Sequence, residues 1–175
     1  MHDVVVVGAG PAGLYLAWLL ARERFDVAVV EEHPDVGSPV HCTGIFAVEA
    51  FDEFCIPRET ILNELTRVRF FAPSGENFEY TTEKLETVVV DRKLFDYKLS
   101  LQAQRAGAKL LTGSKAIDLS ILDDRVIVKR AAAEPLQARV AVLACGADYG
   151  FQRRLGLGVP SVYLQTAQVE VPMKS

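Results

Sequence analysis

The chain has 175 residues, half of them hydrophobic, which is enough for one domain with an ordinary buried core and argues against disorder. Its 23 acidic and 19 basic residues are mixed along the chain and give a formal net charge of −4. The sequence contains no basic block of the kind that binds nucleic-acid phosphates, so we expect no nucleic-acid partner.

The N-terminus and the cysteines bear on where the protein works. The chain begins Met-His-Asp and enters a β-branched run, without the basic region and apolar segment of a signal peptide. No run of about 18 apolar residues could span a bilayer, so we expect a soluble, cytoplasmic protein. Cys42, Cys55 and Cys145 are widely spaced and form no CxxC pair, so we expect free thiols and neither a disulfide framework nor a metal site.

The first thirty residues alternate between strand and helix patterns. Residues 4–7 are a valine run followed by glycines, as in a strand buried on both faces of a parallel sheet. Residues 11–22 predict a helix, because apolar residues recur at helical spacing and Pro11 occupies a first-turn position that needs no donor. A second strand is expected at 27–30, and the three segments together predict a βαβ unit.

Glycine, proline and residue periodicity divide the rest of the chain. Residues 33–43 predict an extended loop, and Pro73-Ser74-Gly75 between two stretches rich in Val, Phe and Tyr predicts a hairpin over 67–82. Asp91 is expected to be the N-cap of a helix that Gly107 ends. Helices are expected over 46–55, 59–65 and 91–106. Strands are expected at 88–90, 109–112, 116–120, 125–130, 139–144 and 162–171.

A glycine-rich turn lies between the first strand and the first helix. The pattern GxGxxG over residues 8–13 is weak alone, but here Gly8 permits a tight turn, Gly10 lets a pyrophosphate approach the backbone, and Gly13 allows close packing of helix and strand. Glu31 ends the second strand, where its carboxylate can accept hydrogen bonds from ribose hydroxyls and would repel a 2′-phosphate. These features predict a site for ADP. Its candidate residues are Gly8, Gly10, Pro11, Ala12, Gly13, Glu31 and Glu32.

Four motifs, taken together, resemble the geranylgeranyl reductase family, within the larger class of FAD enzymes built like p-hydroxybenzoate hydroxylase. The first is the glycine-rich segment 4–22, and the second is the loop Gly37-Ser38-Pro39-Val40-His41-Cys42-Thr43-Gly44, similar to the family's G-x-P-x-x-C-x-G. The third is the strand-to-helix segment 90–96, which contains Arg92. The fourth is Ala144-Cys145-Gly146-Ala147 with a later R-x-L-G, where the family usually has aspartate in place of Cys145.

The resemblance implies the cofactor and the roles of several residues. It implies FAD, with NAD(P)H as an electron donor, and reduction of the carbon–carbon double bonds of an isoprenoid substrate. It places Cys42 beside the flavin ring as the catalytic candidate; without it, Cys42 reads as a small buried thiol. The remaining cofactor-binding candidates that it implies are Thr43, Gly44, Arg92, Cys145 and Gly146. His41 reads as exposed, or in contact with flavin or substrate.

The fold that the resemblance implies is α/β, a Rossmann-type FAD/NAD(P)-binding fold with a parallel central sheet and an added antiparallel β meander. Family members continue through a G-D-A-x-G segment, so we expect residues 1–175 to be an N-terminal fragment that retains flavin weakly. We expect an FAD-binding domain over 1–160, a hairpin excursion over 61–85, and the first strand of a substrate-binding domain over 161–175.

Two other interpretations stay open at this point. The same scaffold supports FAD-dependent monooxygenases and halogenases, and a chain of this length also fits a non-catalytic nucleotide-binding module. A lipid substrate would be compatible with association at a membrane surface. The sequence indicates neither the oligomeric state nor which prenyl chain is reduced.

Overall fold

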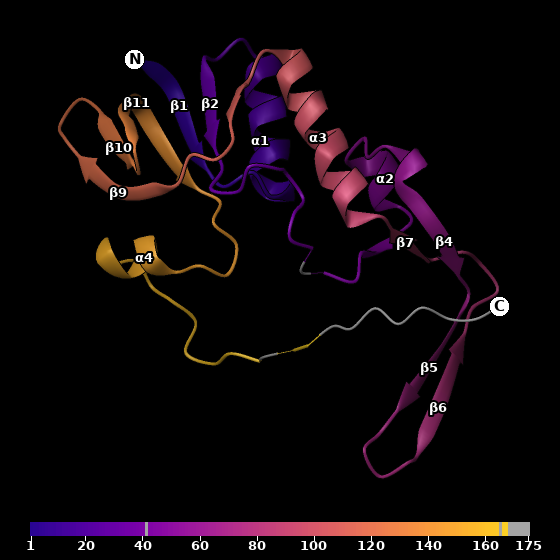
Figure 1. The fold of residues 1–175 in the computed structure, drawn as a ribbon. Coiled ribbons are helices and arrows are strands. Elements are labelled where there is room, and N and C mark those ends of the chain that lie inside the picture. The colour runs from indigo at the N-terminus through magenta and orange to yellow at the C-terminus, as the bar shows by residue number, and fades with distance from the viewer. Residues whose placement is uncertain (41, 165, 168–175) are drawn as a thin grey trace. The chain divides into compact units, whose positions relative to one another are not determined.

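The computed structural model describes residues 1–40, 42–164 and 166–167 (Figure 1). The chain divides into two compact units, of which unit 1 comprises Met1–Ser38 and Asp96–Ala167. The described part of unit 2 lies within Pro39–Phe95. The division falls within helix α3 (Arg92–Ala106), whose first turn belongs to unit 2.

Unit 1 is built on a six-stranded sheet with the order β8-β2-β1-β11-β10-β9. Four neighbouring strands run parallel, namely β8 (Lys109–Leu111), β2 (Val27–Val30), β1 (His2–Val7) and β11 (Ala133–Leu143). The two others, β10 (Val126–Arg130) and β9 (Ala116–Ile121), continue from β11 as an antiparallel meander. The predicted Rossmann-type sheet with an added meander is therefore confirmed.

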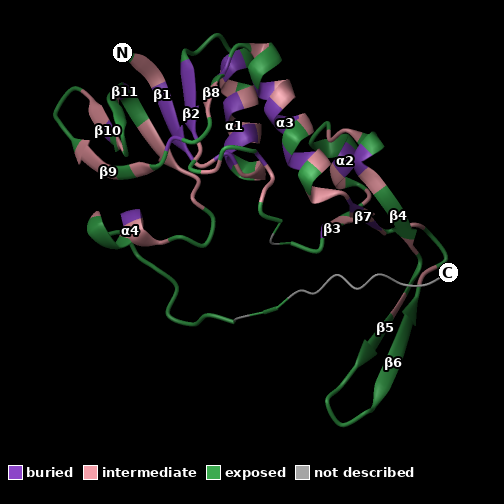
Figure 2. Cartoon of the chain, in the orientation of Figure 1, coloured by how far each residue is buried: buried purple, intermediate pink, exposed green. Residues whose placement is uncertain are grey.

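The centre of this sheet is buried on both faces, as its valine runs predict (Figure 2). On one face lies helix α1 (Pro11–Arg22), which contacts β1 and β2 and buries Leu14 and Ala17. On the other face, Val5 and Val7 pack with Phe151 of the short helix α4 (Gly150–Arg154). The βαβ unit predicted for the first thirty residues is thus present. Its helix and second strand have the expected bounds, and its first strand begins two residues earlier than predicted, at His2.

Unit 2 contains a three-stranded antiparallel sheet of order β3-β7-β4. Its strands are β3 (Ile45–Ala47), β7 (Thr87–Val90) and β4 (Ile61–Leu65). Before α3, the described part of this unit has helical geometry only in two short turns, α2 (Ala50–Glu53) and η1 (Arg58–Thr60). The helix predicted over 59–65 is wrong. The spacing of Ile61, Leu62 and Leu65 fits either element, and pairing with β7 decides for a strand. The helix predicted over 46–55 is reduced to α2.

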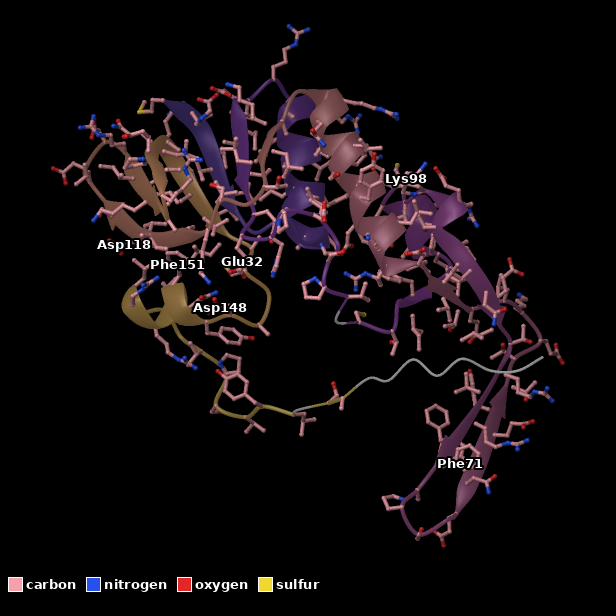
Figure 3. All side chains as sticks on the ribbon, in the orientation of Figure 1. Glu32, Phe71, Lys98, Asp118, Asp148 and Phe151 are labelled. Atoms are coloured by element: carbon pink, nitrogen blue, oxygen red, sulfur yellow. The ribbon has the colours of Figure 1, made fainter. Side chains whose placement is uncertain are left out.

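The predicted hairpin is present as β5 (Arg67–Phe71) and β6 (Asn77–Thr81), joined by a tight turn. Cross-strand register places Val68 opposite Tyr80 and Phe70 opposite Phe78, so these four side chains share one face. The rings of Phe70 and Phe78 stack with their centroids 4.7 Å apart. Both strands are largely exposed, and Figure 3 shows Phe71 among the side chains of this ribbon.

Helix α3 has the predicted ends. Asp91 accepts a hydrogen bond from the backbone N–H of Leu94 through its carboxylate (2.9 Å) and from that of Phe95 through its carbonyl (2.8 Å), which is N-cap geometry. Gly107 follows the last turn at a φ of +113°, a conformation that a side chain would strain.

The strand predicted over 162–171 is not formed at residues 162–164 and 166–167, and its other residues lie outside the described part of the chain. In the described part, no helix has both the length and the apolar character needed to cross a bilayer.

Candidate nucleotide-binding site

The turn that leads from β1 into α1 is packed too closely for side chains at two of its glycines. Gly8 has a φ of +107°, and a Cβ there would lie 2.4 Å from the carbonyl oxygen of Ala144, at the end of β11. A Cβ on Gly13 would lie 2.1 Å from the carbonyl oxygen of Gly8. Gly8 also donates its N–H to the carbonyl of Val30 (2.8 Å). The turn is therefore fixed against β2 and β11 by the backbone itself.

The third glycine of the motif faces open space. No atom lies within 4 Å of the position that a Cβ on Gly10 would take. Gly10 is the N-cap of α1, Pro11 is its first residue, and the first turn holds no acidic side chain. Because Leu14 donates the first intrahelical bond to Gly10 (3.0 Å), the N–H groups of Ala12 and Gly13 precede the helical ladder. This end of α1 has the geometry and the partial positive charge that suit a phosphate group.

The Glu31 carboxylate lies at the mouth of the same turn. One oxygen, Oε2, accepts a hydrogen bond from the backbone N–H of Ala9 (2.9 Å). The other, Oε1, accepts the backbone N–H of His33 (2.9 Å) and lies 2.7 Å from Nδ1 of the His33 ring. The side chain of Glu31 is 13% exposed. The carboxylate is therefore held at both oxygens and remains partly exposed.

Further acidic groups lie at this end of the sheet. Glu32 is exposed and forms a salt bridge with Lys115 (2.8 Å), and this hydrogen bond, followed by the charges of Glu32 and Asp148, raises the pKa of Lys115. Figure 3 labels Glu32 and Asp148, on the loops after β2 and β11 respectively. A second negative group on the ligand, such as a 2′-phosphate, would meet this local negative charge.

Cys145 follows β11 directly behind the glycine turn. Its thiol is half-buried and lies 3.5 Å from the carbonyl oxygen of Val7. Burial raises the pKa of the Cys145 thiol, and the charges of Asp148, Glu32 and Glu31 raise it further. Gly146 is exposed, with a φ of +59° and open space where a Cβ would be. The position that the family usually gives to a carboxylate thus holds a neutral thiol.

The remaining candidates lie in unit 2. Cys42 and Thr43 are exposed, and Cys42 Sγ accepts a hydrogen bond from the N–H of Gly44 (3.4 Å). Gly44 is buried at a φ of +73°, where a Cβ would lie 2.5 Å from the carbonyl oxygen of Val90. Gly44 is therefore required by the protein's own packing, whatever else it contacts. The reading of Cys42 as a buried thiol is wrong.

Arg92 is half-buried at the start of α3, and its guanidinium carbon lies 5.7 Å from the ring centroid of Phe95. Its stem packs beside Gly44, because a Cβ on that glycine would lie 3.2 Å from Arg92 Cγ. The structure thus brings Arg92 and the cysteine loop together within unit 2. It brings the glycine turn, Glu31, Glu32, Cys145 and Gly146 together within unit 1.

Three residues that shape the site were not predicted from the sequence. His33 was assigned to a loop, although it stands two residues after Glu31, a spacing at which a side chain can return to the same carboxylate. Lys115 and Asp148 reach the site through long-range contacts, and nothing local in the sequence marks them.

Comparison with known proteins agrees with this geometry. A family model described as "NAD(P)-binding Rossmann-like domain" matches residues 6–44. The digeranylgeranylglycerophospholipid reductase of Methanocaldococcus jannaschii is 32% identical over 162 residues, which are 90% of this chain and 41% of that protein. The enzyme of the same name from Methanothrix thermoacetophila is 35% identical over 121 residues, 67% of this chain and 31% of that protein.

Solved structures show the same fold. A geranylgeranyl bacteriochlorophyll reductase-like protein from Thermoplasma acidophilum has a TM-score of 0.78 at 29% identity, covering 89% of this chain and 42% of that one. A p-nitrophenol 4-monooxygenase from Pseudomonas putida also has a TM-score of 0.78, at 18% identity and over 93% and 45% of the two chains. A halogenase solved with phloroglucinol and FAD has a TM-score of 0.71 at 20% identity, over 91% and 37%.

The two kinds of match differ in what they establish. The monooxygenase and halogenase share the fold alone, whereas the reductases share sequence along most of this chain, which spans about two-fifths of their length. Over that span the chain is homologous to the geranylgeranyl reductase family, as its motifs predicted.

Proposed function

We propose that this chain binds the ADP moiety of FAD and forms the nucleotide-binding part of an FAD-dependent oxidoreductase. The observation that carries the proposal is the Glu31 carboxylate, held at the mouth of the glycine-rich turn by the N–H of Ala9. The amides at the start of α1 suit the pyrophosphate, and the carboxylate suits the ribose hydroxyls. The open space at Gly10 fits the close approach of such a ligand.

The activity proposed for the protein is reduction of carbon–carbon double bonds in an isoprenoid lipid. It follows from the relatives named digeranylgeranylglycerophospholipid reductase. Bound FAD, once reduced by NAD(P)H, would supply the hydride, while the protein supplies position and exclusion of water. The lipid nature of the substrate favours transient contact with a membrane surface.

Roles are proposed for residues of each unit separately. Gly8, Gly10, Pro11, Ala12 and Gly13 would contact the pyrophosphate, and Glu31 the ribose. Glu32, Cys145 and Gly146 would border the nucleotide. Cys42 is proposed as the catalytic residue beside the flavin ring, with Thr43, Gly44 and Arg92 as cofactor contacts. The exposure of the Cys42 thiol in unit 2 supports a role in contact with a ligand.

Nucleotide binding is tested with two matched ligands and two matched variants. Calorimetry should show that AMP binds more tightly than adenosine 2′,5′-bisphosphate, because the latter differs only by a 2′-phosphate, which would lie where the carboxylate lies. Glu31→Gln should weaken ADP binding by about tenfold, the usual effect of replacing a charge-assisted hydrogen bond. Glu23→Gln, the same change on an exposed residue at the other end of α1, should have no effect. Equal affinity for the two nucleotides would contradict the proposal.

The activity is tested on the protein expressed from its complete gene. Reduced FAD and a lipid that carries geranylgeranyl chains are the substrates, and mass spectrometry should detect the addition of two hydrogens per double bond. Cys42→Ser should slow this reduction while leaving ADP affinity unchanged. Hydroxylation of an aromatic compound without reduction of the lipid would overturn the assignment in favour of a monooxygenase.

A further inference from the structure

His33 is held in place by the backbone on both sides of its side chain. Its N–H donates to Glu31 Oε1 (2.9 Å), and its carbonyl accepts the N–H of Gly113 (2.9 Å). The adjacent Ser114 donates its N–H to the carbonyl of Glu31 (2.7 Å). Residues 31–33 are therefore bound to the turn after β8, and the position of the His33 ring is defined by these contacts.

The His33 ring reaches back to the carboxylate that the nucleotide site depends on. Its Nδ1 lies 2.7 Å from Glu31 Oε1, a length typical of a charge-assisted hydrogen bond. With Glu31 ionised, Nδ1 carries the proton and donates it, because the carboxylate can only accept. The ring is 43% exposed, whereas the carboxylate is 13% exposed. The carboxylate is thus more buried than the histidine that contacts it and is still partly exposed.

The two hydrogen-bonded oxygens fix the plane of the Glu31 carboxylate. Ala9 holds Oε2 through a backbone N–H that cannot rotate away, and His33 holds Oε1 with both its backbone and its ring. A glutamate without the ring contact would keep single donors on each oxygen and could rotate its carboxylate more freely. The ring therefore contributes orientation, which matters for a ligand that must meet both oxygens with two hydroxyl groups.

We propose that His33 is a positioning residue for the adenosine ribose, which acts through Glu31 by fixing the carboxylate that receives the ribose hydroxyls. The inference rests on the proposed function and extends it. If it is correct, His33 strengthens the binding of ligands that have a ribose diol and has no effect on the binding of ligands that lack one. A histidine that merely packs in a loop would affect both kinds of ligand equally or neither.

The test compares three variants with two nucleotides, ADP and 2′,3′-dideoxy-ADP, by calorimetry on the full chain. His33→Ala should weaken ADP binding about fivefold, the effect of one hydrogen bond that orients a ligand contact. His33→Asn should stay within about twofold of the unsubstituted protein, since its amide N–H can take the position of Nδ1, whereas His33→Gln displaces its donor and should resemble His33→Ala. The dideoxy nucleotide should bind all three variants and the unsubstituted protein equally.

Several outcomes would overturn the inference. If His33→Ala binds ADP as well as or more tightly than the unsubstituted protein, the ring is irrelevant or competes with the ribose. If it weakens the dideoxy nucleotide as much as ADP, the ring supports the loop alone, and thermal melting would register the same loss. Failure of the unsubstituted protein to bind either ADP or FAD would instead remove the proposed function, a result distinct from a failure at His33.

Discussion

The six-stranded sheet of unit 1 and the hairpin of unit 2 both contain large hydrophobic side chains, but these are buried in the sheet and largely exposed in the hairpin. Val29 in β2 is completely buried between neighbouring strands and layers, whereas Phe70 and Phe78 in the hairpin lie about half exposed or more. The four inner strands of the sheet, β2, β1, β11 and β10, pair on both sides, whereas β5 and β6 pair only with each other. A two-stranded ribbon of this kind is marginal by itself.

This difference in burial indicates that the sheet of unit 1 contributes more to stability than the hairpin and is more closely packed. In unit 1 the positions of Gly8 and Gly13 and the buried strands have close neighbours, so small changes there should have large effects. In the hairpin, substitutions of the same kind affect side chains that are largely exposed to solvent, so they should have small effects on stability. Four predictions test this contrast, beginning with the largest expected effect.

Gly13→Ala should destabilise the fold by about 3 kcal/mol, because the added methyl would overlap the Gly8 carbonyl and the backbone has no room to move. Gly10→Ala, three residues away, adds the same methyl into open space at a permitted φ of −73°. Gly10→Ala should lower the free energy of unfolding by less than about 1 kcal/mol, because alanine is a poorer N-cap than glycine. It should nevertheless impair ADP binding. Urea unfolding measures the difference, and similar losses for the two variants would contradict the packing described.

Val29→Ala should destabilise the fold by about 2 kcal/mol, because it empties space in a fully buried strand. Val68→Ala makes the same chemical change in β5 of the hairpin, where the side chain is only partly covered. Its cost should be below about 1 kcal/mol. Equal costs in chemical unfolding would show that the hairpin is packed as firmly as the sheet.

The cysteines of the two units should differ in reactivity. Cys42 is exposed, whereas burial and three nearby carboxylates raise the pKa of Cys145. A raised pKa leaves less thiolate at any given pH, so Cys145 should be alkylated roughly tenfold more slowly than Cys42 at mildly alkaline pH, and its rate should rise only at higher pH. Peptide mass spectrometry after timed labelling of a Cys55→Ser variant measures both rates. Labelling of Cys145 as fast as Cys42 would contradict the structure.

The smallest effect on stability is expected when the ion pair between Arg69 and Glu79 in the hairpin is removed. The hydrogen bond from Arg69 to Glu79 (2.7 Å) lowers the pKa of that exposed carboxyl, and the charge of Arg67 adds to it. Arg69→Gln should let the Glu79 pKa return toward its ordinary value, with no measurable change in thermal stability. Arg67→Gln should move it less, because Arg67 acts through charge alone. Carbon-13 NMR titration of Glu79 decides between these results.

The parts of unit 1 that the sequence predicts well are those with local patterns. The bounds of α1 and β2 follow from the spacing of their own apolar residues and from Pro11 and the glycines. The position of the Glu31 carboxylate at the turn follows from strand length alone. Its role in ligand binding stays a proposal.

The segments that the sequence predicts poorly take their structure from partners far along the chain. Residues 61–65 are a strand because β7 lies beside them, more than twenty residues later. Ile45–Ala47 is a strand for the same reason. The hydrogen bond from Gly113 to the His33 carbonyl and the salt bridge of Lys115 depend on where the turn after β8 lies, which no local pattern reveals. Tertiary contact decided each of these cases.

The close approach of Ala144 to Gly8 has a consequence for how the protein is made. Cys145 and Val7, which meet beside that contact, are 138 residues apart in the chain, so the wall behind the glycine turn is absent until β11 has been synthesised. The emerging chain can pair β1 with β2 early, but the other edge of β1 stays unpaired until β11 leaves the ribosome much later. Pairings between segments so distant in the sequence form slowly. Acquisition of ADP affinity would therefore wait until β11 has been synthesised and has paired with β1.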